Sequence, residues 1–169
     1  MKLKLLATLI VVFITAGTNA QKKRNMTPGK TLVAYFSATG NTAKAARKIA
    51  ASTGGTLYAI QPIQKYTTAD LNWNDKNSRS TKEMNDAKSR PGIKKTLKDI
   101  QQYDTVYIGF PIWWDLAPRV INTFIESYNL TGKTIIPFAT SGGSGIDNSE
   151  KQLKKSYPKL KWKPGKLMN

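Results

Sequence analysis

Apolar runs of strand length alternate with amphipathic helical patterns along this chain. Runs rich in apolar, aromatic and β-branched residues predict strands at Thr31–Phe36, Thr56–Ile60, Thr105–Phe110, Lys133–Ala139 and, more weakly, Leu160–Trp162. Apolar residues at helical spacing predict helices over about Thr42–Ser52, after Pro91, after Pro118 and from Asp147 onward. The alternation indicates an α/β domain whose parallel sheet carries helices on both faces.

Two stretches fit this alternation poorly. Gln61 to Arg90 is long, polar and irregular, with a lone Trp73, and loops of this length are usually functional or disordered. Pro137 stands inside the fourth predicted strand, although its missing N–H normally restricts proline to an edge or a bulge. The long segment is a candidate for covering a site or selecting a partner.

Three unusual loops follow the first, third and fourth strands, and right-handed crossovers place such loops at one edge of the sheet. The first, Ser37–Thr42, is rich in hydroxyl and amide groups and opens a helix, whose N-terminal N–H groups and dipole favour an anion. The second contains Trp113 and Trp114, and the third, Thr140–Gly145, is rich in glycine. Together they predict one pocket for a phosphate attached to a flat ring.

Each loop alone has a simpler interpretation. Most polar turns between a strand and a helix bind nothing, and Ser37–Thr42 matches neither the Walker phosphate loop nor the three-glycine dinucleotide motif. The tryptophan pair can belong to the core, but two adjacent residues cannot both face the same side of an element. At least one of the two indoles is therefore expected to face a ligand or solvent.

Composition limits the chemistry that side chains can supply. The 169 residues include no Cys and no His, which excludes thiolate nucleophiles, His bases and the common zinc sites and favours a bound cofactor. The 27 basic and 10 acidic residues give a formal charge of +17. This charge suggests an acidic partner or an anionic surface, or only a well-solvated exterior, and no nucleic-acid-binding module is recognisable.

The first twenty residues have the pattern of a secretory signal peptide. Lys2 and Lys4 precede the apolar run Leu5–Ala16, which is too short to span a bilayer, and small residues before Gln21 offer a cleavage site. Cleavage would leave 25 basic against 10 acidic residues, a charge of +15, and no transmembrane span. We expect an exported protein with a flexible lead-in over residues 21–30; a retained N-terminal anchor is the alternative.

The three loops resemble those of the flavodoxin family, specifically its secreted or larger flavodoxin-like branch. Tyr35–Thr42, Gly109–Trp114 and Pro137–Gly145 carry the resemblance, which extends roughly from Thr31 to Lys166. It implies a three-layer sandwich around an open, parallel five-stranded sheet of order 2-1-3-4-5. It also implies that residues 31–169 bind FMN non-covalently and transfer electrons, and the family tolerates a proline at position 137.

The resemblance assigns the FMN contacts by position, with no catalytic side chain and no metal. The phosphate is expected at Ser37, Thr39, Gly40, Asn41 and Thr42. The isoalloxazine ring is expected between two walls, which are Pro111, Ile112, Trp113 and Trp114 on one side and Thr140, Ser141, Gly142, Gly143 and Gly145 on the other. The second wall lacks the aromatic residue of small flavodoxins, so the resemblance does not fix which ring faces are stacked.

Two features differ from the usual pattern of the family. Familiar flavodoxins are acidic, whereas this chain is basic, so we expect an acidic redox partner and a less negative flavin potential. The family also adds a helix after the fifth strand, and here the sequence stops at Asn169. A truncated chain, another element over that sheet face, or a weakly stable domain would each account for the difference.

Three other interpretations compete with that of an electron carrier. One is an FMN-dependent oxidoreductase that reduces quinones or other small acceptors, which turnover with a reduced nicotinamide would distinguish from a carrier. Another is a basic, non-redox module that binds an anionic polymer or membrane surface. The third is a non-functional remnant that lacks its last helix.

Overall fold

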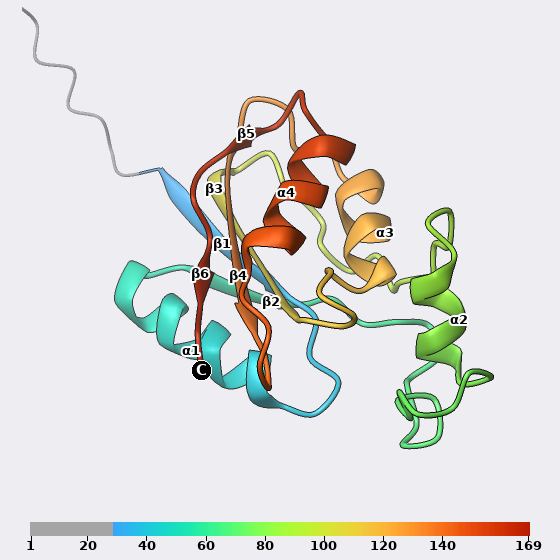
Figure 1. Cartoon of the computed structure of the whole chain (residues 1–169). Coiled ribbons are helices and arrows are strands. Elements are labelled where there is room, and N and C mark those ends of the chain that lie inside the picture. Colours follow the sequence, from blue (N-terminus) through green and yellow to red (C-terminus); the bar gives the residue numbers. More distant parts are fainter. Residues whose placement is uncertain (1–28) are drawn as a thin grey trace, which may run out of the picture.

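A parallel β-sheet organises residues 29–169, the part of the chain that this computed structural model describes (Figure 1). Its strands follow the order β2-β1-β3-β4-β5, which confirms the predicted order 2-1-3-4-5, and a sixth strand also pairs with β4. The predicted signal peptide and nearly all of the predicted lead-in lie outside the described residues. The strands are β1 (Lys30–Tyr35), β2 (Thr56–Ala59), β3 (Tyr103–Pro111), β4 (Thr134–Thr140), β5 (Lys161–Trp162) and β6 (Lys166–Leu167).

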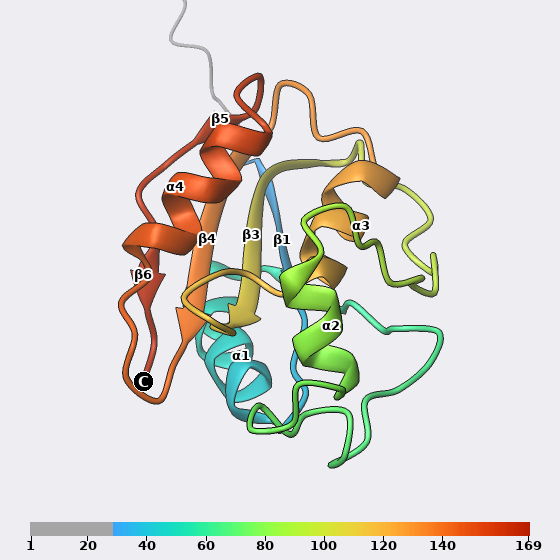
Figure 2. The same ribbon diagram turned by 45° about the vertical axis from the view of Figure 1, so that its right-hand side comes forward.

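Helices cover the two faces of the sheet unequally. α1 lies on one face, while α3 and α4 lie on the other and α2 stands beside α3 (Figures 1 and 2). Within residues 29–169, none of the helices has the length and apolar character needed to cross a membrane. The helices are α1 (Asn41–Thr53), α2 (Arg79–Asn85), α3 (Arg119–Ser127) and α4 (Asp147–Ser156).

The alternation of side chains along each strand divides the core into two clusters. Leu32, Ile108 and Ile135 face α3 and α4, where they pack with Phe124 of α3 and Leu153 of α4. The neighbouring positions on β1 and β4 face α1 instead, and they form a smaller cluster of Val33, Phe138, Ala45, Ala46, Ile49 and Ala50. Because successive strand residues point to opposite faces, each central strand serves both layers.

The helix predicted after Pro91 is wrong, and α2 forms earlier, inside the segment that looked irregular. Ser78 caps α2 by accepting a hydrogen bond from the Thr81 N–H. Downstream of Pro91, the chain is extended, and Ile93 forms an isolated antiparallel bridge with Pro62. The apolar spacing after Pro91 therefore buries side chains from an extended segment, and Ile93 and Ile100 are both in the core.

Pro137 lies within β4 without interrupting its pairing with β3, where it stands opposite Ile108. The interruption falls on the edge side, since β5 pairs with Thr134 and Ile135 while β6 pairs with Phe138 and Ala139. A proline has no N–H to donate. Because the edge strand is split at this position, β5 and β6 pair with the residues of β4 on either side of Pro137. The last strand predicted from the sequence was Leu160–Trp162, so β6 was missed.

α4 begins at Asp147, as predicted. Its N-cap residue, Ile146, makes no side-chain hydrogen bond to the helix end, so neither Asp147 nor Glu150 caps the helix. The Glu150 carboxylate instead accepts hydrogen bonds from the Gly165 N–H, at 2.9 Å, and from Lys154. Glu150 thereby fastens the turn between β5 and β6 to α4.

No helix follows β5 in the described chain, so the α1 face of β3 and β4 is covered in another way. Phe138 lies across Gly109 of β3, where an added Cβ would come within 2.1 Å of the phenylalanine ring. Met168 packs against the same cluster from beyond β6. Side chains of the sheet and of the last residues thus cover part of the face for which the family would use a helix.

Candidate functional site

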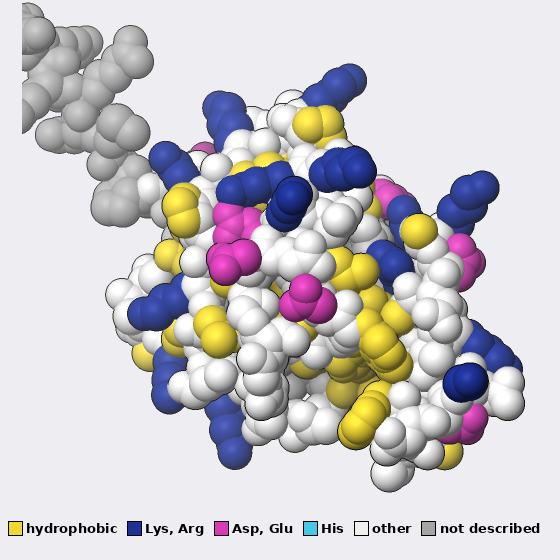
Figure 3. Space-filling model, in the orientation of Figure 1, with side chains coloured by type: hydrophobic (Ala, Val, Ile, Leu, Met, Phe, Trp, Pro, Cys, Tyr) yellow, Lys and Arg dark blue, Asp and Glu magenta, His cyan; other side chains and the backbone are white. Residues whose placement is uncertain are grey.

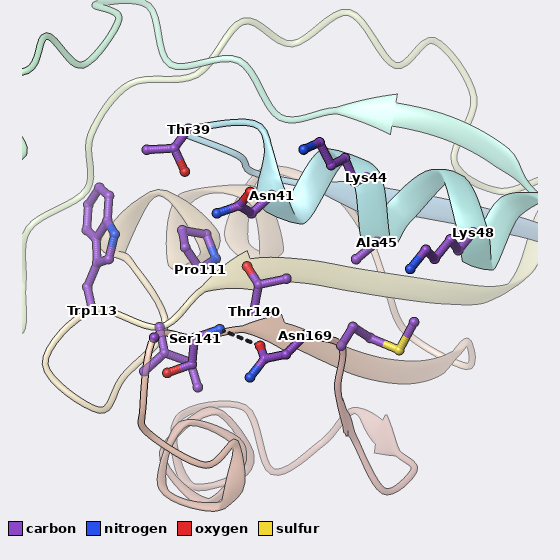
Figure 4. A pocket seen from close by; sticks show the side chains of 13 residues that line it. Thr39, Asn41, Lys44, Ala45, Lys48, Pro111, Trp113, Thr140, Ser141 and Asn169 are labelled. Carbon is purple, nitrogen blue, oxygen red and sulfur yellow. Dashed lines mark hydrogen bonds between the residues drawn. The ribbon is translucent and has the colours of Figure 1, made fainter.

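The loops after β1, β3 and β4 meet at the carboxyl edge of the sheet and enclose a cavity of about 470 Å³ (Figure 4). Ladder pairing aligns them, because Tyr35 stands opposite Gly109 and Pro111 stands opposite Thr140. The predicted residues that line this cavity are Thr39, Asn41, Pro111, Ile112, Trp113, Thr140, Ser141 and Gly142. We call it the main cavity.

The loop after β1 has the geometry of an anion site. Gly40 is the N-cap of α1 with φ 94°, a left-handed conformation that glycine adopts without strain. The Ser37 hydroxyl oxygen accepts the N–H groups of Gly40 and Ala43 at 3.1 and 3.2 Å, which fixes the turn. In the described chain the N–H groups of Asn41 and Thr42 have no acceptor, so the helix end offers two free donors.

Not every predicted residue of this loop faces the main cavity. Ser37 and Gly40 line a separate cavity on the other side of the loop, next to Pro62 and Tyr66. The Thr42 side chain is 1% exposed, and its hydroxyl bonds the Thr140 hydroxyl at 2.8 Å. Thr42 therefore joins the first loop to the end of β4 and does not itself line the main cavity.

The loop after β3 is a strained two-residue turn. Trp113 and Leu116 exchange both backbone hydrogen bonds at 2.9 Å, and the two residues between them, Trp114 and Asp115, have φ 46° and 63°. Left-handed non-glycine residues cost on the order of 1–3 kcal/mol each and occur mostly at functional sites. The start of α4 supports the turn, because the Ser149 hydroxyl donates to the Asp115 carbonyl at 3.1 Å.

The two tryptophans have separate positions, although both were expected to line the ring wall of one pocket. Trp113 packs edge-on against Phe36 and Tyr66, with ring centroids 5.6 and 5.3 Å apart, and also forms one end of the main cavity (Figure 4). Trp114 is 43% exposed and lies outside the main cavity. The expectation that at least one indole faces a ligand or solvent is confirmed.

Tyr66 packs against Trp113 and helps to hold it, a contact that no sequence pattern indicated. The Tyr66 hydroxyl donates to Glu83 of α2, and the Arg79 guanidinium lies 4.0 Å from the centre of the Tyr66 ring. Burial and then the hydrogen bond to Glu83 raise the pKa of Tyr66 far above its ordinary value, so the hydroxyl stays protonated and donating. The unassigned segment between β2 and β3 thus supports the ring wall of the site.

The glycine-rich loop after β4 is shaped mainly by Ser141. Its hydroxyl oxygen accepts the N–H groups of Gly143 and Ser144 at 3.1 and 2.8 Å. Gly142 lines the main cavity with open space where a side chain would stand, whereas Gly143 and Gly145 do not line it. The backbone of Ser141 and Gly142 is therefore the part of this loop that reaches the cavity.

A sequence model of the flavodoxin family matches residues 30–169, nearly all of the described chain. The chain belongs to the flavodoxin family. Two solved proteins named as flavoproteins share the fold at a TM-score of 0.82 each. The one from Bacteroides eggerthii is 64% identical over 82% of this chain and 87% of its own. The one from Bacteroides uniformis is 62% identical over 83% and 90%.

A more distant flavodoxin-like fold comes from Lactobacillus acidophilus. This flavoprotein, solved in complex with FMN, is 23% identical over 82% of this chain and 93% of its own, with a TM-score of 0.70. At that identity the likeness concerns the fold alone. No curated protein matches the sequence.

Five residues of the main cavity were not predicted as flavodoxin site residues. Lys44, Ala45 and Lys48 line it from α1, and Met168 and Asn169 line it from beyond β6. The Asn169 side-chain oxygen accepts the Ser141 N–H at 3.0 Å (Figure 4). The lysines had a readable signal, since they stand four residues apart directly after the phosphate loop. Nothing in the sequence pointed to the last two residues.

The Thr42–Thr140 bond gives a testable prediction for the architecture of the site. Thr42→Val should lower the free energy of unfolding by about 1–3 kcal/mol, because it leaves a buried Thr140 hydroxyl unpaired. The double variant Thr42→Val/Thr140→Val should be less destabilised than the sum of the two single variants, since both polar partners are removed together. Urea unfolding measures all four proteins, and strictly additive losses would contradict a direct hydroxyl pair.

Proposed function

We propose that this protein binds FMN non-covalently in the main cavity and acts in electron transfer. The observation that carries the proposal is a single cavity with an anion-binding helix end at one side and an indole at the other. FMN has this same layout, with a phosphate at one end of a ribityl chain and a flat ring at the other.

The phosphate end of the cavity fits the group chemically. Asn41 and Thr42 offer backbone N–H groups at the positive end of the α1 dipole, and Thr39 adds a hydroxyl at the cavity wall. Gly40 holds the turn that presents these groups, because its φ of 94° would strain a residue with a side chain although an added Cβ would meet nothing within 4 Å. These groups bind a phosphate dianion by charge-assisted hydrogen bonds.

The ring end fits a flat conjugated system. Trp113 presents a rigid indole held by Phe36 and Tyr66, and Ser141 and Gly142 line the same cavity. Bound FMN would supply the redox chemistry. The chain's own residues bind the cofactor, orient its ring and exclude water from one side of it.

The likeness to known proteins supports the same function. The flavoprotein of Lactobacillus acidophilus was solved with FMN, and the two Bacteroides proteins of over 60% identity are named as flavoproteins. Electron transfer follows from the family's usual role. We also propose export and an acidic partner, on the strength of the N-terminal pattern and the formal charge of +17.

FMN uptake by the purified protein tests the proposal. We expect a visible flavin spectrum that shifts on binding and a saturable titration at one FMN per chain. Gly40→Ala should weaken FMN by roughly 5- to 150-fold, because alanine at φ 94° costs about 1–3 kcal/mol and draws the loop into another conformation.

Gly132→Ala is the matched control for Gly40→Ala. Gly132 also has a positive φ, 81°, and also has nothing within 4 Å of an added Cβ, but it lies in the turn before β4. The Gly132→Ala variant should lose about as much stability as Gly40→Ala and keep its FMN affinity. A protein that never takes up FMN would refute the proposal. An equal loss of FMN affinity in both variants would show that the loop after β1 is not part of the FMN site.

The two lysines of the main cavity give a prediction for the flavin potential. Lys44 and Lys48 extend toward the N-terminal end of α1, and no acidic residue lines this cavity (Figure 4). Their positive potential favours a reduced, anionic flavin. Lys44→Gln/Lys48→Gln should therefore move the midpoint potential to more negative values, on the order of tens of millivolts, with a smaller shift at high salt.

Lys151→Gln/Lys155→Gln removes the same charge at the same spacing from α4, on the other face of the sheet. Potentiometry should find a much smaller shift in this control. Equal shifts in the two double variants would attribute the potential to net charge and not to the cavity lysines.

A further inference from the structure

A second cavity, of about 420 Å³, adjoins the main cavity and shares Trp113 with it. Its walls come from two parts of the chain that are distant in sequence, the segment after β2 and the loop after β3. Figure 3 shows hydrophobic side chains gathered in a hollow between α2 and the ends of the central strands. Its volume lies in the range of ligand pockets, about 300–1,000 Å³. We call it the indole cavity.

Two exposed indoles line this cavity. Trp73 is 72% exposed and Trp114 is 43% exposed, and both line the cavity together with Trp113 and Leu71. Tryptophan carries a large apolar surface, so leaving two of them in water at one place is unfavourable unless something covers them. Isolated exposed apolar residues need no explanation, whereas a hollow lined by several indoles indicates a binding site.

The backbone holds both indoles in place without burying them. Trp114 stands in the strained left-handed turn at φ 46°, which directs its side chain out of the core. Trp73 lies between Asn72 and Asn74, whose turn closes through an Asn74 N–H bond to the Asn72 side chain at 3.1 Å. The Ser80 N–H donates to the Asp70 carbonyl at 2.9 Å and ties this loop to α2. The cavity is therefore built by ordered segments.

The lining determines the chemistry of a ligand. All nine lining residues lie in the described chain, and none of them is charged; Thr39 and Ser80 supply its hydroxyl groups. Indole faces stack on flat conjugated rings, and an uncharged wall disfavours a desolvated ion. We propose that the indole cavity binds an uncharged, planar aromatic compound of one or two rings.

The position of the indole cavity extends the proposed function. It shares Thr39, Pro111, Ile112 and Trp113 with the main cavity, so a ligand there would lie beside the flavin. Resting on the proposed function, the inference places an uncharged, planar aromatic compound beside the flavin of an electron carrier. The binding site itself does not require FMN.

Calorimetric titration with 2-naphthol, a neutral and redox-inert two-ring probe, tests the inference on the full chain with and without saturating FMN. We expect one binding site, with an affinity that FMN does not lower. Trp73→Ala should weaken 2-naphthol at least fivefold and leave the FMN affinity unchanged, because Trp73 lies outside the main cavity. Ile63→Ala, which removes another exposed apolar side chain of the same segment, should leave both affinities unchanged.

A charged isostere separates this site from binding to surface lysines. 2-Naphthalenesulfonate should bind the indole cavity more weakly than 2-naphthol does. Tighter sulfonate binding that Trp73→Ala does not affect would overturn the inference, as would displacement of 2-naphthol by FMN or an equal loss of FMN affinity in Trp73→Ala. If the chain binds 2-naphthol as expected but never binds FMN, the proposed function fails while the indole cavity stands.

Discussion

The candidate site depends on the parallel alignment of β1, β3 and β4, because this pairing brings three loops to one edge of the sheet. β2 and β3 flank β1 on opposite sides, so the order in which strands are added to the sheet reverses between β1 and β3. Ligands of open α/β sheets bind at such a switch point. Backbone bonds continue the alignment into the loops, since the Phe36 N–H donates to Gly109 and the Ile112 N–H donates to Thr140. The buried Thr42–Thr140 bond closes the arrangement from the helix side.

The features that the sequence predicted well are those with a local physical cause. Apolar runs and turn residues located the strands, and the three loops were found because hydroxyl, tryptophan and glycine residues follow strand ends. The failures come from tertiary context. Apolar spacing after Pro91 suits an extended buried segment as well as a helix, and β6 pairs only because the split edge accommodates Pro137. Tyr66 and Lys44 join the site through packing that no short motif encodes.

Charge and apolar surface divide the region around Trp113 into two environments. The main cavity has backbone donors and two lysines, which suit an anionic cofactor, whereas the indole cavity has no charged lining residue. Trp113 belongs to both, and its position depends on Tyr66, Glu83 and Arg79 of the segment between β2 and β3. That segment, irregular in sequence, thus supports one wall of the cofactor site and forms part of the second cavity.

A crystal structure of the protein saturated with FMN tests the central claim most directly. The account predicts that the phosphate accepts the N–H groups of Asn41 and Thr42, and that the ring lies between Trp113 and the Ser141–Gly142 backbone. It also predicts that Trp73 and Trp114 leave the indole cavity open beside the flavin. A flavin ring placed against Trp73, or a phosphate bound away from the start of α1, would contradict the account.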